Sequence, residues 1–168
     1  FAPHEWRSHL ADADCLVHST GTLSEAPDAG VTLERLNGDS AIVAALEADR
    51  AGLDRVVYVS SSNKPPLVRE AYITARRRAE AAIADLATET VIPRFGSVYG
   101  PDQPHFPTLA NRFFAALGRF EAVASRLGED RPFHVERAAA IVFELAAMAD
   151  PPESPVTAPT LTGLADPD

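Results

Sequence analysis

The apolar residues of this chain fall into short runs that alternate with longer segments of helical periodicity. The runs at 15–17, 55–60 and 91–95 show little polar alternation, which is typical of strands buried on both faces. Over 33–51 and 69–88, apolar residues recur every three or four positions. This spacing predicts two helices, one before and one after the middle strand in the sequence.

Beyond the third run, the pattern predicts a short helix over 111–117 and a longer one over 136–149. The stretch from Asp150 holds five of the fourteen prolines, so we expect it to be irregular. The chain therefore divides into a folded unit over 1–149 and a proline-rich tail over 150–168, which we interpret as the start of a truncated C-terminal region.

The alternation of strands and helices predicts an α/β fold in which helices flank a parallel sheet. In such sheets, ligands bind at the carboxyl ends of the strands. The loops at 18–21, 60–63 and 96–100 each follow a predicted strand and are rich in polar residues and glycine. We therefore expect these loops to meet at one edge of the sheet and form a binding site.

Composition narrows the classes of function. The 168 residues carry a net charge of −9, which argues against binding to a nucleic-acid phosphate backbone. No apolar run approaches the roughly 20 residues that span a bilayer. The single cysteine and the scattered histidines offer no set of metal ligands, so no metal site is expected. These features predict a soluble, cytoplasmic protein.

Six segments, taken in chain order, resemble the motifs of one enzyme superfamily. They are Asp14–Gly21, Leu36-Asn37-Gly38, Arg55–Ser62, Tyr72-x-x-x-Arg76, Pro93–Pro101 and Pro132–Glu136. Together they resemble the extended or atypical branch of the short-chain dehydrogenases/reductases, the NAD-dependent epimerase/dehydratase group. The resemblance covers residues 12–149 and implies a Rossmann-like fold.

The resemblance also implies a function. Members of the group exchange a hydride between NAD or NADP and a small-molecule substrate, such as a nucleotide-sugar or another secondary alcohol or ketone. A tyrosine serves as general acid/base in that chemistry, and a nearby cation favours its phenolate. The alternative is a non-catalytic member of the same fold that binds NAD(P) as a sensor or has a structural role.

Carried onto this sequence, the resemblance assigns the catalytic positions to Ser62, Tyr72 and Arg76. Arg76 stands where the family motif has lysine, and it could instead pair with Glu80. Tyr72 could simply pack against the loop before its helix. The positions implied for cofactor binding are His18, Gly21, Asn37, Ser60, Ser61, Arg94, Phe95, Gly96 and Ser97.

Two departures from the family pattern bear on these expectations. The chain contains no Gly-x-x-Gly-x-x-Gly run, so we expect the first strands and the glycine-rich pyrophosphate loop of the fold to be missing from it. The only lysine, Lys64, could replace the motif lysine, but it lies in a proline-rich loop, where a solvated surface position is expected instead. By analogy with the family, helices 33–51 and 69–88 could form a homodimer interface, although their apolar faces could equally cover the sheet of their own chain.

Overall fold

Parallel strands form the centre of the chain in the computed structural model, which describes residues 6–101, 114 and 125–164. The strands are β1 (Cys15–His18), β2 (Arg55–Tyr58), β3 (Ser60–Ser61), β4 (Glu89–Val91), β5 (Arg94–Phe95), β6 (Val98–Tyr99) and β7 (Phe133–His134). The order in the main sheet is β1-β2-β4, and β3 pairs with β5 and β6 with β7. Every strand pair described is parallel, which confirms the predicted α/β class.

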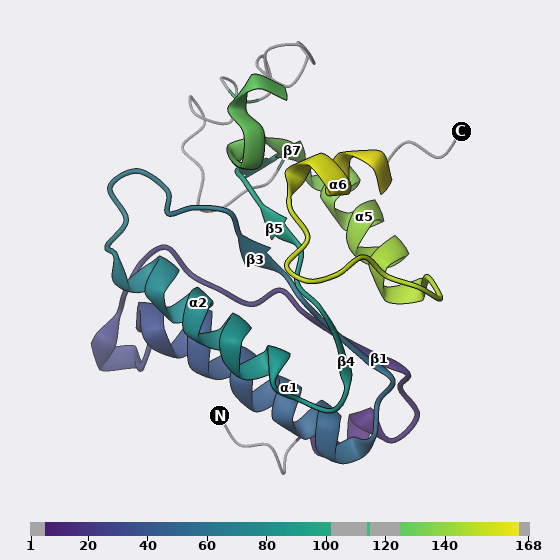
Figure 1. The fold of residues 1–168 in the computed structure, drawn as a ribbon. Coiled ribbons are helices and arrows are strands. Elements are labelled where there is room, and N and C mark those ends of the chain that lie inside the picture. Colours follow the sequence, from purple (N-terminus) through teal and green to yellow (C-terminus); the bar gives the residue numbers. More distant parts are fainter. Residues whose placement is uncertain (1–5, 102–113, 115–124, 165–168) are drawn as a thin grey trace.

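Helices lie on both faces of this sheet (Figure 1). They are α1 (Ser40–Ala51), α2 (Ala71–Ala84), α5 (Val135–Ala147) and α6 (Ala158–Leu164), with shorter helical turns η2 (Arg7–Leu10), η3 (Pro27–Ala29), η4 (Arg35–Asp39) and η5 (Ser125–Asp130). Within the described residues, no helix has the length and apolar character needed to cross a membrane. The helix expected over 111–117 lies outside the described residues except for position 114.

The side chains of β2 alternate between the two faces and so define two cores. Val56 and Tyr58 pack with α1 and α2, whereas Val57 packs with α5. All three are fully buried, as expected for a strand covered on both sides. The alanine-rich faces of α1 and α2 thus cover the sheet of their own chain.

The strands break at Val59 and Pro93, although the register continues across both breaks. Val57 pairs with Val91 before the breaks and Ser60 pairs with Arg94 after them. The carbonyl of Val59 accepts a hydrogen bond from Arg76. Pro93 has no N–H to donate to a ladder and bridges to Val156 of the tail. At the interruption the Val59 carbonyl bonds to a side chain and Pro93 bridges to the tail, while the Ser60 N–H still donates to the Pro93 carbonyl.

The helix predicted over 33–51 forms, but with a π-helical turn, η4, within it. It ends at Gly52, which takes a left-handed conformation with φ of 76° and donates back to Asp49 at 3.1 Å. The second helix is shorter than predicted, because α2 ends at Ala84.

The tail departs from its prediction as an irregular segment, because Ala158–Leu164 form helix α6. Val156, Ala158 and Leu161 are buried in the same core as α5. The Val156 N–H donates to Ile92, and its carbonyl accepts from Arg94. The prolines stop regular structure only between these anchoring residues, and burial of their apolar neighbours orders the rest.

Arg55 joins the sheet to the end of α5. Its Nη1 donates to the carbonyls of Leu145, Ala146 and Met148 at 3.1, 3.0 and 2.7 Å, and the side chain is 11% exposed. It thereby satisfies carbonyls that a helix C-terminus otherwise leaves unpaired.

We therefore expect Arg55→Met to lower the free energy of unfolding by about 1–3 kcal/mol, because three partly buried carbonyls lose their donor and Glu89 loses its ion pair. The matched control is Arg78→Met, which removes an exposed ion pair with Asp39 and should cost less than about 1 kcal/mol. Urea unfolding of both variants measures the difference. Equal losses would contradict the role assigned to Arg55.

Candidate functional site

A cavity of about 940 Å³ lies at the carboxyl ends of the parallel strands. Nine of the twelve residues singled out from the sequence line it: Gly21, Ser60, Ser61, Ser62, Tyr72, Arg76, Phe95, Gly96 and Ser97. They come from the loop after β1, from β3 and its connection to α2, from α2, and from β5 and the loop after it. The convergence of loops predicted from the strand pattern therefore exists and forms a hollow of ligand size.

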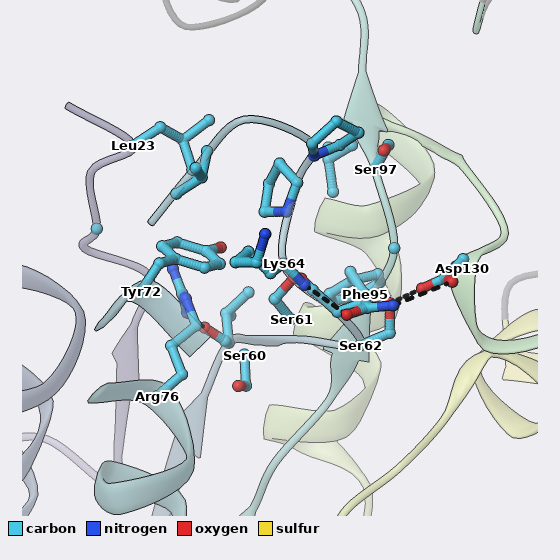
Figure 2. A pocket seen from close by; sticks show the side chains of 18 of the residues that line it. Leu23, Ser60, Ser61, Ser62, Lys64, Tyr72, Arg76, Phe95, Ser97 and Asp130 are labelled. Carbon is cyan, nitrogen blue, oxygen red and sulfur yellow. Dashed lines mark hydrogen bonds between the residues drawn. The ribbon is translucent and has the colours of Figure 1, made fainter. Parts of the chain in front are cut away.

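Tyr72 lies in the first turn of α2, and Arg76 follows it one helical turn later. The Arg76 guanidinium carbon is 4.9 Å from the centroid of the Tyr72 ring, a cation–π arrangement. In Figure 2 the Tyr72 hydroxyl points away from Arg76 and into the pocket. The charge of Arg76 therefore faces the ring rather than the phenolic oxygen.

Arg76 is buried, with 8% of its surface exposed. Its Nη1 donates to the carbonyl of Val59 at 2.9 Å, and its Nη2 to Oδ1 of Asn37 at 3.3 Å. Its Nε is a buried donor without a partner among the described residues. The guanidinium thus connects α2, the strand break and the Asn37 turn.

The Asn37 side chain holds the loop after β1. Its Oδ1 accepts from the Thr22 N–H at 3.1 Å, and its Nδ2 donates to the Thr22 carbonyl at 2.9 Å. A Cβ on Gly21 would lie 2.6 Å from Nη2 of Arg76 and 2.7 Å from Oδ1 of Asn37, so any other residue here would have to displace these two side chains. Asn37 is fully buried beneath the loop, so it positions the cavity wall without lining it.

The π-helical turn explains how Asn37 serves two elements. Its backbone carbonyl accepts a hydrogen bond of 2.9 Å from the Tyr58 hydroxyl. A π turn loosens the regular ladder of a helix, and such turns are frequent at functional sites. Asn37 can therefore bond to the loop with its side chain and to β2 with its backbone.

The three serines direct their hydroxyls to different partners. Ser60 donates to Glu80 at 2.6 Å, and Ser61 donates to the carbonyl of Asn63 at 2.7 Å. Ser62 donates to Oδ1 of Asp130 at 2.9 Å, as Figure 2 shows. Asp130, at the end of η5, is a cavity residue that the sequence reasoning missed.

The position of Asp130 depends on a close backbone contact. A Cβ on Gly96 would lie 2.4 Å from the Arg131 carbonyl and 2.7 Å from the Asp130 carbonyl, so glycine lets this segment approach the loop after β5. Asp130 also accepts a longer bond of 3.5 Å from Asn63. Since 68 positions separate Ser62 from Asp130, no local motif could have revealed this pair.

Glu80 pairs with two arginines, neither of which is Arg76. Its carboxylate accepts from Ser60, from Arg77 at 2.6 Å and from Arg94 at 2.5 and 3.1 Å. The Glu80 carboxylate raises the pKa of Arg94 above its usual value. Arg94 thus lies away from the cavity, and the Arg76–Glu80 pair considered from the sequence is replaced by Arg77–Glu80 and Arg94–Glu80.

His18 is also displaced from the cavity wall. It is 8% exposed, its ring centroid lies 5.7 Å from that of Tyr58, and its Nδ1 has no partner among the described residues. Burial, together with the positive charge of Arg76, lowers the pKa of His18 from 6.5 to about 4. His18 is therefore a neutral ring beneath the site rather than a residue of its surface.

The comparisons with known proteins concern the fold alone. The sequence matches no protein-family model and no curated protein. The structure is similar to that of a putative NAD-dependent epimerase/dehydratase from Bacillus halodurans, with a TM-score of 0.58, 19% identity, and coverage of 84% of this chain and 62% of the other.

Two further solved structures are similar. One is a UDP-N-acetylglucosamine 4-epimerase from Methanobrevibacter ruminantium M1, in complex with UDP-N-acetylmuramic acid (TM-score 0.59, 16% identity, 88% of this chain, 56% of the other). The second is a short-chain dehydrogenase/reductase superfamily protein from Agrobacterium tumefaciens with bound NAD (TM-score 0.59, 15% identity, 88% of this chain, 60% of the other).

The fold is that of the NAD-dependent epimerases and dehydratases. The resemblance noted in the sequence is thereby confirmed at the level of the fold. The chain spans little more than half the length of the solved structures it matches.

The low pKa of the buried His18 predicts that the free energy of unfolding depends on pH. The unfolded chain takes up a proton on this ring below pH 6.5, whereas the folded chain does so only near pH 4. Stability is therefore complete above pH 6.5 and falls as the pH drops toward 4. Between pH 7 and pH 5, we expect the free energy of unfolding to fall by about 2 kcal/mol through this residue.

Urea unfolding at the two pH values tests this expectation, with His18→Phe as the comparison. Phenylalanine has a similar shape and no proton to take up, so the variant should lose about 2 kcal/mol less than the wild type between pH 7 and pH 5. The same pH dependence in both proteins would contradict the assignment.

Proposed function

We propose that this chain contributes the substrate side of the active site of an NAD(P)-dependent oxidoreductase of the epimerase/dehydratase or reductase type. The observation that carries the proposal is the position of Tyr72, whose hydroxyl points into the cavity at the carboxyl ends of the strands. The proposed substrate class is a nucleotide-sugar or another secondary alcohol or ketone. UDP-linked compounds in complexes with similar folds support this class.

The cavity residues suit this chemistry. In the oxidising direction, the phenolate of Tyr72 takes the proton of the substrate hydroxyl, and in the reverse direction the phenol returns it to the carbonyl oxygen. The Ser62 hydroxyl, whose proton is donated to Asp130, keeps lone pairs that can accept a hydrogen bond from a substrate hydroxyl. Together these groups can hold an alcohol and move its proton.

The residues present fit one end of a dinucleotide. Gly21, Ser60, Phe95, Gly96 and Ser97 form a wall of small and flat side chains that would hold the nicotinamide and its ribose. NAD(P), when bound, accepts or donates the hydride. The sequence has no Gly-x-x-Gly-x-x-Gly run to present backbone N–H groups to the pyrophosphate.

Two features favour the alternative of a non-catalytic member of this fold. Arg76 replaces the motif lysine and directs its charge to the ring of Tyr72 and to the loops beneath. The Ser62 hydroxyl donates to Asp130 rather than toward the tyrosine. Homodimer formation through helices 33–51 and 69–88 stays a prediction, to be met by faces other than the buried alanines that pack within the chain.

We expect the 168-residue chain alone to bind NAD+ and NADP+ weakly or not at all. The pyrophosphate normally gains backbone N–H donors and a helix N-terminus from the glycine-rich turn, and this chain does not carry that turn. Isothermal titration calorimetry of the purified chain measures the affinity. Micromolar binding of either cofactor would show that the described cavity suffices by itself.

In a parent protein that includes a pyrophosphate loop, we expect Tyr72→Phe to reduce turnover about 100- to 10,000-fold, because only the proton-transferring hydroxyl is lost. Cofactor affinity should stay nearly unchanged. The matched control is Tyr99→Phe, since Tyr99 packs edge-on against His134 and is not among the residues that line the cavity. The measurement is nicotinamide absorbance with a panel of UDP-sugars.

Unchanged turnover in Tyr72→Phe would remove the acid/base assignment. If the parent binds NAD(P) but shows no turnover with its wild-type sequence, the non-catalytic alternative becomes the better description.

A further inference from the structure

Five apolar residues line a part of the cavity that the proton transfer and the nicotinamide do not use. They are Leu23, Pro65, Pro66, Val68 and Leu127, and we call them the outer wall. Three segments supply them, namely the connection from β1 to η3, the loop between β3 and α2, and η5. Apolar side chains thus reach the cavity from three separate parts of the chain.

The outer wall is not an extension of the hydrophobic core. Among the described residues, neither core cluster includes any of its five members. Leu127 keeps 42% of its surface exposed, and Leu23 and Val68 are half-buried. By contrast, Phe95 on the nicotinamide side of the cavity is fully buried and packs in the core with α5. The apolar surface of the outer wall is therefore open to a molecule that occupies the cavity.

The charged side chains of the cavity do not suit a diphosphate. Arg76 is buried and donates to two neighbouring segments, and the Lys64 ammonium lies 3.9 Å from the Glu70 carboxylate. Asp130 adds a carboxylate, which accepts from Ser62 at 2.9 Å. Phosphate groups are normally held by several N–H donors or by arginines directed at them, and a carboxylate repels them. Among the described lining residues, the side chains provide no such set of donors.

From this lining we propose that the substrate is an uncharged secondary alcohol or ketone with an aromatic or branched aliphatic group that packs on the outer wall. The inference rests on the proposed function for the reacting oxygen at Tyr72, and it selects one of the two substrate classes given there. A hollow of about 940 Å³ into which the Tyr72 hydroxyl points fits a small molecule (Figure 2). Small-molecule sites are typically lined by apolar side chains, with a few polar groups that fix the orientation of the ligand.

The first measurement is binding to the 168-residue chain without a cofactor. The probes are benzylacetone, a neutral ketone that carries a phenyl group, and UDP-glucose. Saturation-transfer NMR titrations give the affinity of each. We expect benzylacetone to bind more tightly than UDP-glucose, because its phenyl group removes apolar surface of the wall from water and it brings no phosphate toward Asp130.

Two variants locate the bound ketone. Leu23→Asn and Leu127→Asn each change a side chain of the outer wall that lies outside both cores, so each variant should keep the fold. Each should weaken benzylacetone binding by about threefold or more, because apolar contact with the ligand is lost. Circular dichroism verifies that the variants are folded.

The matched control is Leu67→Asn. Leu67 lies between two residues of the outer wall in the sequence, but it is fully exposed and is not among the residues that line the cavity. Its φ of 67° is in the left-handed region, which asparagine adopts more readily than leucine. This variant should therefore bind benzylacetone as the wild type does.

Three results would overturn the inference. They are the absence of benzylacetone binding, binding of UDP-glucose as tight as that of the ketone, and an unchanged benzylacetone affinity in both outer-wall variants. The last result would place the ketone on the nicotinamide side of the cavity.

A parent protein that includes a pyrophosphate loop separates this inference from the proposed function. Turnover of UDP-sugars without turnover of benzylacetone or its alcohol would refute the inference and keep the function. The expected binding, without turnover of any alcohol or ketone, would refute the function and keep the outer wall as an apolar binding site.

Discussion

The arrangement of the cavity depends on one buried guanidinium. Arg76 bonds to Val59 at the strand break and to Asn37 in the π-helical turn, and it packs on the ring of Tyr72. Each partner belongs to a different segment, so a single side chain sets the relative positions of three walls of the site. Burying a charge is costly unless it is hydrogen-bonded, as Arg76 is. Position 21 is a glycine where a Cβ would displace the bonded guanidinium.

A second buried charge, one turn further along α2, also connects this helix to other segments. Glu80 is bonded by Ser60, Arg77 and Arg94, and so joins the helix to β3 and β5. Arg77 also donates to the carbonyls of Ser61 and Ser62. The segment that carries the serines is thus held by Arg77 and Glu80, neither of which lines the cavity. Residues 76, 77 and 80 make α2 the support of the site as well as part of its wall.

Much of this fold follows from the sequence, because buried parallel strands and amphipathic helices have clear periods. The strand at 15–17, the helix ending at Gly52 and the loops that meet at the sheet edge all follow from local pattern. The break at Val59 does not, since it depends on a bond from Arg76, 17 positions away. Helix α6 was not predicted because the tail is rich in proline. The helix is ordered by burial of Leu161 in the core that includes α5.

The candidate site was predictable to the same extent. Spacing from strand ends identified the segments of the wall, but it could not say which side chains face the cavity. His18, Asn37 and Arg94 lie behind the wall, because each has partners there that are distant in sequence. Asp130 was missed because it comes from a segment remote in sequence. Lys64 was expected on the solvated surface because its loop is rich in proline, but it lines the cavity.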